Sequence, residues 1–336
     1  MEHRSRAARA WGVPFAADRA RGQHRVLHLA AEASVCGRRV KRVGCVYHPS
    51  VVGAEAVARA LGAIVAARGI DHWVAELPRD NADGAEGRLR EAVAASDLLI
   101  CVGGDGTVLH ASGIAARSDV PVFGVRMGRL GFLAEATEAE APDGLATILD
   151  GGGRIERRMM LQARVGDGEP LHALNEVLIG GEHLGRTVSV GLRVEGVLLA
   201  EYRADAVIAA TATGSTGYAL AVGGPILPPT SQDLIVTPVA PHLSYTNALV
   251  LPGDARVELE VARGFRSLMI VDGAQEQAVS SGEIVHIGRS PMTASFYRLG
   301  GEQQFYANLA KRLGWLRIDH ALGPDARHDE ASDQPV

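Results

Sequence analysis

The segment Gly103–Thr107, whose sequence is GGDGT, combines the residue types best suited to chemistry in this chain. It follows the apolar run Asp97–Val102 and precedes a stretch with helical spacing, so we expect a loop between a strand end and a helix N-terminus. Backbone N–H groups and the helix dipole attract phosphate oxygens at such a junction, and glycines let the backbone approach them closely. The sequence therefore predicts a phosphate-binding loop formed by Gly103, Gly104, Gly106 and Thr107.

Asp105 is the unusual member of this loop, because an acid in an anion-binding site repels the ligand. A carboxylate at this place could accept a proton from an attacking hydroxyl or help to hold Mg²⁺. The alternative is a plain turn in which Asp105 caps the following helix. The segment has neither the Lys and spacing of a P-loop nor a G-x-G-x-x-G pattern, so its spacing indicates phosphate chemistry without naming the acceptor.

The residues around this loop predict strands that alternate with helices. Such an alternation indicates a parallel sheet with crossover helices. The predicted strands are Arg42–Tyr47, Ile70–Leu77, Asp97–Val102 and Val120–Val125, and the predicted helices are Gly53–Arg68, Glu86–Ala95 and Thr107–Ala116.

The pattern changes after Asp150–Gly153, which is expected to be a hinge or linker. Between Ile155 and Tyr297 the sequence predicts short strands separated by turns, a spacing typical of an antiparallel sandwich. A single helix is predicted near the end, over Phe305–Trp315. The predicted strands of this half are Met159–Val165, His172–Ile179, Val188–Val194, Val197–Glu201, Ala206–Ala210, Val257–Val261 and Ser267–Val271.

Length and composition fit a globular protein of two domains. The chain has 336 residues, of which 47% are hydrophobic and 22% charged. A formal net charge of −5 argues against a nucleic-acid-binding surface, and no apolar stretch reaches the length of a membrane span. Cys45 and Cys101 lie in apolar runs without a CxxC pair, which favours buried reduced thiols and a cytoplasmic location.

Both ends of the chain differ in composition from the rest. Residues 1–40 are rich in Ala and Arg, which is compatible with a transit peptide, a disordered extension or a start codon assigned too far upstream. The lack of a continuous amphipathic stripe favours the last two. Residues 318–336 are polar and contain Pro, Asp and Gly, so they are expected to form a disordered tail.

Four further segments occur in a fixed order together with GGDGT, and the set resembles the NAD kinase family. The resemblance extends from Arg42 to Leu316, and Val271-Asp272-Gly273 is a weaker part of it. The four segments are Gly124–Leu133 (GVRMGRLGFL), Leu174–Ile179 (LNEVLI), Thr211–Pro225 (TATGSTGYALAVGGP) and Thr237–His242 (TPVAPH).

The resemblance implies a Rossmann-like α/β domain with a parallel sheet over residues 41–150 and an all-β sandwich over 151–298. NAD would lie between the two, and residues 299–317 would pack back on the first domain. Members of the family transfer a phosphoryl group from ATP, or from polyphosphate in some cases, to the 2′-hydroxyl of the adenosine ribose of NAD. The resemblance further implies Mg²⁺ or another divalent cation bound with ATP, and a homodimer or homotetramer.

The family's site residues can be placed on this sequence one by one. Asp105 would lie beside the 2′-hydroxyl and accept its proton. No protein side chain is expected to be a metal ligand. The residues expected to contact NAD are Gly106, Phe132, Asn175, Glu176, Asp205, Thr213, Thr216, Tyr218 and Ala240.

The chemistry of these side chains is compatible with that placement, although each also has a simpler interpretation. Asn175 offers a donor and acceptors, and the adjacent Glu176 can accept from ribose hydroxyls. As a purely structural alternative, the pair could occupy an exposed strand edge. The Thr- and Gly-rich segment 211–218 could be an ordinary turn, and Asp205 a surface acid.

The sequence departs from the usual family pattern at a few positions. Arg126 stands where an Asn is frequent, and Ala212 replaces a Pro. Ala206 follows Asp205 where Gly is usual, and Thr246-Asn247 stands where Arg-Pro is often found. These departures leave open the choice between NAD and NADH and between ATP and polyphosphate.

Two other functions share parts of the pattern. Lipid kinases of the diacylglycerol or sphingosine type also carry GGDGT, but they would require an apolar substrate and a means of membrane association. A non-catalytic NAD-binding protein could retain the fold, although loss of the acid at Asp105 would then be expected.

Overall fold

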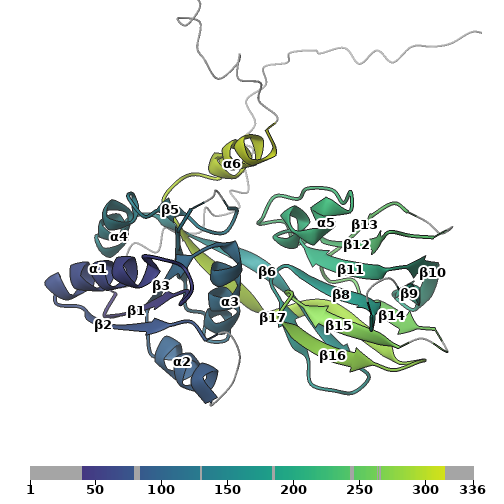
Figure 1. The fold of residues 1–336 in the computed structure, drawn as a ribbon. Coiled ribbons are helices and arrows are strands. Elements are labelled where there is room, and N and C mark those ends of the chain that lie inside the picture. Colours follow the sequence, from purple (N-terminus) through teal and green to yellow (C-terminus); the bar gives the residue numbers. More distant parts are fainter. Residues whose placement is uncertain are drawn as a thin grey trace, which may run out of the picture. The chain divides into compact units, whose positions relative to one another are not determined.

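The computed structural model describes residues 40–78, 84–128, 131–183, 186–242, 246–262, 264 and 266–314 (Figure 1). The predicted extension before Val40 and the predicted tail at 318–336 lie outside these ranges. So do Cys36, Trp315 and two residues of the Gly124–Leu133 motif, Arg129 and Leu130.

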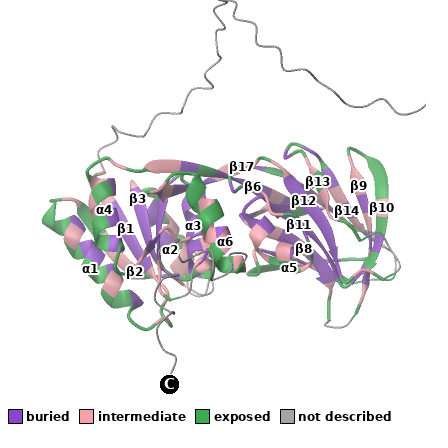
Figure 2. Cartoon of the chain, turned by 90° about the horizontal axis from the view of Figure 1, so that it is seen from above, coloured by how far each residue is buried: buried purple, intermediate pink, exposed green. Residues whose placement is uncertain are grey.

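The first half of the structure is a parallel sheet covered by helices on both faces, as predicted. In spatial order its strands are β2 (Asp71–Glu76), β1 (Arg42–Tyr47), β3 (Leu98–Gly103) and β4 (Val122–Arg126). All six residues of β3 are buried, as expected for a central strand with both faces covered (Figure 2). Cys45 and Cys101 are buried in this sheet, as the apolar runs around them predicted.

Two pairs of helices cover this sheet. Helices α1 (Ala54–Ala67) and α4 (Ala141–Leu149) share a buried cluster with one face of the strands. Helices α2 (Ala85–Ala94) and α3 (Asp105–Ala116) share a cluster with the other face. Helix α1 buries residues spaced three and four apart, such as Ala54, Ala58 and Leu61, which is the pattern that predicted it.

The second half is a β-sandwich, so the predicted fold class is confirmed. One of its layers is a six-stranded antiparallel sheet with the order β13-β12-β11-β8-β15-β16. The strands of this layer are β8 (Glu176–Gly181), β11 (Ala206–Thr211), β12 (Leu234–Val239), β13 (Leu249–Leu251), β15 (Ser267–Val271) and β16 (Gln275–Val279).

The other layer continues the sheet of the first half. The complete sheet has eleven strands, and its main path runs β10-β9-β14-β17-β4-β3-β1-β2. Apolar side chains of the two layers form one buried cluster between them. The additional strands are β5 (Ala136–Thr137), β6 (Arg154–Val165), β7 (Leu171–Ala173), β9 (Val188–Val194), β10 (Val197–Ala204), β14 (Val257–Val261) and β17 (Ile284–Arg298).

Two long strands connect the halves. Strand β17 pairs with β6 from Val285↔Val165 to Arg298↔Arg154, and it also pairs in parallel with β4 at Phe296↔Val122 (Figure 1). The sequence did not predict β17, because Pro291 interrupts its apolar pattern. In the structure this Pro lies within a register irregularity between Arg289 and Thr293, a place where a strand tolerates Pro.

The glycines expected to form a hinge end helix α4 and lead directly into β6. The N–H of Gly151 donates to the Ile148 carbonyl at 3.0 Å, and that of Gly152 donates to Thr147 at 2.8 Å. Gly151 and Gly153 have positive φ angles of 86° and 80°. Within the described residues, no helix is long and apolar enough to cross a bilayer.

Candidate functional site

The GGDGT loop joins the end of β3 to the start of α3. Gly103 is the last residue of the strand and Gly104 is extended, with φ −90° and ψ 179°. A Cβ at Gly103 would lie 2.5 Å from the Thr107 Oγ1, so the buried Thr107 side chain requires glycine there. The helix begins two residues earlier than predicted, at Asp105. The exposed Gly104 and Gly106 therefore lie at a strand end and at a helix N-terminus, where N–H groups can meet phosphate oxygens.

The Asp105 carboxylate is held by the neighbouring chain segment. Its Oδ2 accepts the N–H of Phe132 at 2.7 Å, and its Oδ1 accepts the N–H of Leu133 at 3.2 Å. A Cβ at Gly131 would lie 1.9 Å from Oδ1, so only glycine allows this approach. The helix-capping alternative does not fit, because Gly104 occupies the N-cap position and the Asp105 carboxylate accepts N–H groups of a different segment. The carboxylate is instead oriented by the segment that carries Phe132.

Helix α6 (Gln303–Leu313) lies beside Asp105 and Phe132. The Arg312 Nη1 is 3.4 Å from the Asp105 Oδ2, and the Arg312 guanidinium lies over the Phe132 ring at 4.4 Å. The Phe305 ring is 6.3 Å from that of Phe132. The Arg312 and Asp105 side chains are 39% and 31% exposed, so a ligand can still reach the pair. The predicted terminal helix contains Arg312, but no sequence pattern assigned this residue a role at the site.

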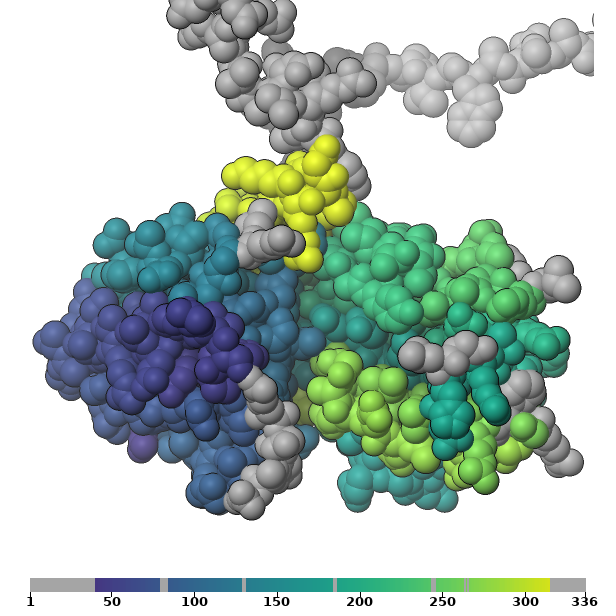
Figure 3. All heavy atoms as spheres, viewed as in Figure 1, coloured from purple at the N-terminus to yellow at the C-terminus, as the bar shows by residue number. Residues whose placement is uncertain are grey.

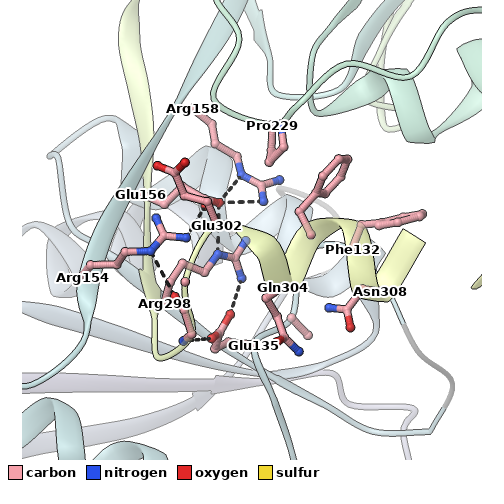
Figure 4. Close-up of a pocket in the computed structure, with 14 residues that line it drawn as sticks. Phe132, Glu135, Arg154, Glu156, Arg158, Pro229, Arg298, Glu302, Gln304 and Asn308 are labelled. Carbon is pink, nitrogen blue, oxygen red and sulfur yellow. Dashed lines mark hydrogen bonds and ion pairs between the residues drawn. The ribbon is translucent and has the colours of Figure 1, made fainter. Parts of the chain in front are cut away.

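A buried set of charged residues, which we call the arginine–glutamate cluster, lies next to this site (Figure 4). It consists of Glu135, Arg154, Glu156, Arg158 and Arg298. The Glu156 Oε1 accepts from the Arg158 Nη2 at 2.9 Å and from the Arg298 Nε at 3.1 Å, while its Oε2 accepts from Arg154 at 3.0 Å. Arg298 also bonds Glu135 at 3.0 Å. Burial raises the pKa of Glu156, but Arg158 and Arg298 outweigh it and lower this pKa to about 2.

A small cavity separates the cluster from helix α6 (Figure 4). It measures about 30 Å³, room for about one water molecule. Phe132 and Pro229 line it together with Gln304 and Phe305 of α6. The Arg298 Nη2 is buried and has no hydrogen-bond partner among the described residues, and Arg298 is one of the residues that line this cavity.

The second group of predicted residues lies at the start of β8. The N–H of Thr211 donates to the Asn175 carbonyl at 2.9 Å, which holds the end of β11 against Asn175. A Cβ at Gly214 would lie 2.1 Å from the same carbonyl oxygen, and one at Gly217 would lie 3.3 Å from the Glu176 Oε2. The two motifs predicted to contact the nucleotide, Asn175-Glu176 and the Thr- and Gly-rich loop, are therefore packed against each other.

Glu176 has an incompletely bonded side chain. Its Oε2 is buried and has no hydrogen-bond partner among the residues that the structure describes. Burial, together with the nearby Asp272 carboxylate, raises the pKa of Glu176 to about 7. A buried acceptor without a partner is costly unless a ligand or a water supplies one.

The remaining residues of the Thr- and Gly-rich loop differ in accessibility. Thr213 is buried, and its Oγ1 also lacks a hydrogen-bond partner within the described part of the chain. The Thr216 hydroxyl donates to the Thr213 carbonyl at 3.1 Å, and Tyr218 is 43% exposed. Of these side chains, the Tyr218 ring is therefore the one open to a ligand, while the Thr213 hydroxyl lies beneath the surface.

The GGDGT loop with Phe132 and the Asn175-Glu176 pair both adjoin the same buried apolar cluster. Val108 after the GGDGT loop, Leu133 after Phe132 and Leu174 before Asn175 all belong to one buried cluster. Figure 3 shows the two halves of the structure meeting below α6, which is yellow in that view. Asp105 and Asn175-Glu176 thus border the same buried cluster.

Asp205 and Ala240 lie elsewhere. Glu176 pairs with Ala210 near one end of β11, whereas Asp205 precedes the other end, about 17 Å away along the strand. The N–H of Asp205 donates to the Val239 carbonyl at 3.0 Å, next to Ala240, which has a positive φ of 45°. Both residues are exposed, and the His242 Nε2 is 3.7 Å from the Asp205 Oδ1. The structure brings these two together, but away from Asn175 and Glu176.

Among the described ranges, no group of three or more His, Cys, Asp or Glu side chains is arranged to hold a metal ion. Asp105 is a single carboxylate that already accepts two N–H groups.

Both halves of the chain match known family models. Residues 32–153 match the ATP-NAD kinase N-terminal domain, and residues 174–299 match the ATP-NAD kinase C-terminal domain. An NAD kinase from Chloroflexus aggregans is 38% identical over 280 residues, which are 82% of this chain and 99% of that relative. An NAD kinase from Dehalococcoides mccartyi is 33% identical over 278 residues, covering 81% and 96% respectively.

Solved structures show the same fold. An NAD kinase from Archaeoglobus fulgidus in complex with ATP has a TM-score of 0.67 at 24% identity, covering 82% of this chain and 100% of that one. Yeast NADH kinase in complex with NADH has a TM-score of 0.71 at 20% identity, covering 84% and 90%. With both domains matched and relatives above 30% identity over most of its length, the chain belongs to the NAD kinase family.

Proposed function

We propose that this chain phosphorylates NAD to NADP by transferring a phosphoryl group from ATP to the 2′-hydroxyl of the adenosine ribose. The observation that carries the proposal is the placement of Asp105. Its carboxylate is fixed by the N–H groups of Phe132 and Leu133 at the junction of β3 and α3, around the same core as Asn175-Glu176.

In this mechanism Asp105 accepts the proton of the 2′-hydroxyl. The 2′-oxygen then forms a bond to the γ-phosphorus in line with the bond that breaks, and ADP leaves with the bridging oxygen. The N–H groups at the start of α3 and the guanidinium of Arg312 offset the negative charge on the transferred group. Mg²⁺ enters with ATP as part of that substrate and supplies charge neutralisation at the donor phosphates.

Acceptor recognition is assigned to the second group of residues. Asn175 and Glu176 offer hydrogen bonds to the adenosine part of NAD, and Thr213, Thr216 and Tyr218 surround it from the adjoining loop. Phe132 contributes an apolar wall, and Gly106 allows close approach to the phosphates. Asp205 and Ala240 lie at the opposite end of β11 from Glu176, where they would reach the nicotinamide end of an extended NAD.

We expect the protein to act in the cytoplasm as a homodimer or homotetramer, as the family resemblance implies. Light scattering would measure the oligomeric state. A coupled assay of NADP formation would compare ATP with polyphosphate as donor, and NAD with NADH as acceptor.

Asp105→Asn tests the central role. The variant keeps an oxygen that can accept the Phe132 N–H but cannot take up a proton at neutral pH. We expect NADP formation to fall about 10²- to 10⁴-fold, the usual contribution of a general base. A folded variant, checked by its melting temperature, that retains near wild-type activity would refute the role of Asp105.

The two alternative functions are separable by direct assay. A lipid kinase would label a diacylglycerol or sphingosine lipid from labelled ATP and leave NAD unlabelled. A non-catalytic NAD-binding protein would bind NAD in calorimetry and form no NADP with Mg·ATP or polyphosphate.

A further inference from the structure

Asp272 lies in the turn between β15 and β16, where its residue type has a simple local explanation. Asp272 and Gly273 have positive φ angles of 50° and 67°, and the N–H of Ala274 donates to the Val271 carbonyl at 3.1 Å. These features define a β-turn whose two central residues have positive φ, a conformation in which Asp-Gly is favoured, at the tip of a hairpin whose first paired residues are Val271 and Gln275. Asn-Gly and Gly-Gly form the same turn, so the turn itself does not require a carboxylate.

The carboxylate of Asp272 points away from its own hairpin and binds the start of β8. Its Oδ2 accepts the N–H of Leu174 at 2.8 Å, and its Oδ1 accepts the N–H groups of Asn175 at 2.8 Å and Glu176 at 3.1 Å. In the opposite direction, the N–H of Asp272 donates to the Glu176 carbonyl at 3.0 Å. Three successive N–H groups thus converge on one charged acceptor, an arrangement stronger than neutral hydrogen bonds.

These bonds fix the residues assigned to nucleotide recognition. The ladder between β15 and β8 ends at Val271↔Val177, so Leu174, Asn175 and Glu176 lie beyond it. On their other side, the Asn175 carbonyl accepts the N–H of Thr211. The Asp272 side chain therefore completes the backbone support of the Asn175-Glu176 segment from the β15 side.

We infer that Asp272 is a positioning residue for the acceptor nucleotide, holding the backbone from Leu174 to Glu176 so that the Asn175 and Glu176 side chains face bound NAD. This inference rests on the proposed function. It assigns to Asp272 an effect on NAD binding and none on donor binding, because the GGDGT loop makes none of these contacts.

The charge of Asp272 has a second effect, on the side chain of Glu176. Burial and this neighbouring carboxylate raise the pKa of Glu176 to about 7, while Asn175 and Gly217, which also lie against Glu176, carry no charge. The pKa of Asp272 is itself raised by burial to about 6, although its three backbone N–H partners act in the opposite direction. At neutral pH Glu176 therefore spends part of its time protonated, and removing the Asp272 charge should lower the pKa of Glu176.

The test compares Asp272→Gly and Asp272→Asn with a matched control. Both replacements tolerate positive φ and keep the turn, while Gly removes every side-chain acceptor and Asn keeps a neutral one. The control is Asp97→Asn, because the Asp97 Oδ2 also accepts two successive N–H groups at a strand start, those of Lys41 at 2.8 Å and Arg42 at 3.1 Å. Melting temperatures verify that each variant is folded.

We expect Asp272→Gly to raise the KM for NAD about tenfold or more, with a smaller rise for Asp272→Asn and little change in the KM for ATP. Asp97→Asn should leave the KM for NAD unchanged. An unaltered KM for NAD in folded Asp272→Gly, or an equal rise in the control, would overturn the inference. If Asp272→Gly does not fold, Asp272→Asn decides by the same criterion.

Calorimetry with NAD alone separates this inference from the proposed activity. If the wild-type protein makes no NADP, the proposed function fails, but the Kd for NAD still reports on Asp272. The pH dependence of that Kd adds a readout that a purely structural role would not change. We expect its midpoint to move to lower pH in Asp272→Asn, and an unmoved midpoint would overturn the action of the Asp272 charge on Glu176.

Discussion

Two sets of carboxylates in this protein have opposite electrostatic environments. In the arginine–glutamate cluster, both oxygens of Glu156 accept from arginines and its pKa falls to about 2. At the start of β8, the Glu176 Oε2 has no hydrogen-bond partner among the described residues. Burial and the nearby Asp272 carboxylate raise the pKa of Glu176 to about 7. Both side chains are largely withdrawn from water, so burial alone does not explain the difference.

The contrast separates a structural from a functional use of a buried acid. Glu156 is neutralised entirely by the protein's own side chains, which makes it a bridge between β6 and β17. Among the described residues, Glu176 keeps one unsatisfied oxygen beside a glycine-rich loop, where a ligand can supply the hydrogen bond. If the distinction holds, substitutions at the two acids should differ in both the size and the pH dependence of their effects.

The largest effect is expected from Glu156→Gln. This change leaves Arg158 buried without its charged partner and removes one of the two from Arg298, so we expect the free energy of unfolding to fall by about 3 kcal/mol or more. Urea unfolding at pH 7 measures it. The control is Glu260→Gln, which removes a partly exposed pair with Arg193 at 3.7 Å and should cost at most about 1 kcal/mol. Equal losses in the two variants would contradict the structural role of Glu156.

The second prediction concerns how stability depends on pH through Glu176, whose pKa is shifted in the opposite direction to that of Glu156. Its folded pKa of about 7 lies above its ordinary value of 4.5, so unfolding releases a proton between these pH values and stability falls as pH rises through them. Glu176→Gln removes the ionisable carboxyl, so the variant should not lose this stability as pH rises. We expect the variant to match the wild type below pH 4.5 and to gain about 1 to 3 kcal/mol by pH 7.

Urea unfolding across this pH range checks the prediction at Glu176, with the KM for NAD measured in parallel. The KM should rise in Glu176→Gln because a predicted nucleotide contact is lost. A variant whose stability relative to wild type does not depend on pH would show that the Glu176 carboxyl is not strained by its surroundings.

The smallest effect on stability, and a moderate one on rate, is expected at Arg312. Its ion pair with Asp105 is partly exposed, so Arg312→Gln should cost at most about 1 kcal/mol of stability. Its charge lies beside the transferred phosphoryl group in the proposed mechanism, so we expect kcat to fall about tenfold, with partial recovery in Arg312→Lys. Steady-state kinetics measure both, and the adjacent Lys311→Gln is the control. A kcat equal to that of the control would remove Arg312 from the mechanism.

The sequence predicted those structural elements that depend on a local pattern of residues. A short apolar run located β1 at its observed bounds, and another, followed by residues with helical spacing, placed the GGDGT loop between β3 and α3. Strand β17 was missed because its signal is broken by Pro291 and its partners β4, β6 and β14 are distant in the chain.

The missed site contacts have the same origin. Arg312 lies 207 residues from Asp105, Arg298 lies 142 from Glu156, and Asp272 lies 98 from Leu174. Hydrophobic periodicity describes neighbouring residues only, so it cannot predict contacts between residues this far apart in the sequence. Weaker signals did exist: Arg154, Glu156 and Arg158 alternate along one strand face, and the Asp272-Gly273 turn accompanied the family motifs. Neither signal indicates which distant groups the side chains will meet.

The long strand β17 has a consequence for how the protein folds during synthesis. Residues 284–298 complete the hydrogen bonding of β4 in the first half and of β6 and β14 in the second. Until the ribosome has synthesised this segment, those edges lack a partner, and unpaired edges invite association with other chains. The two halves should therefore acquire their stable structure together and late, and a fragment that ends before residue 284 should aggregate rather than form an independent domain.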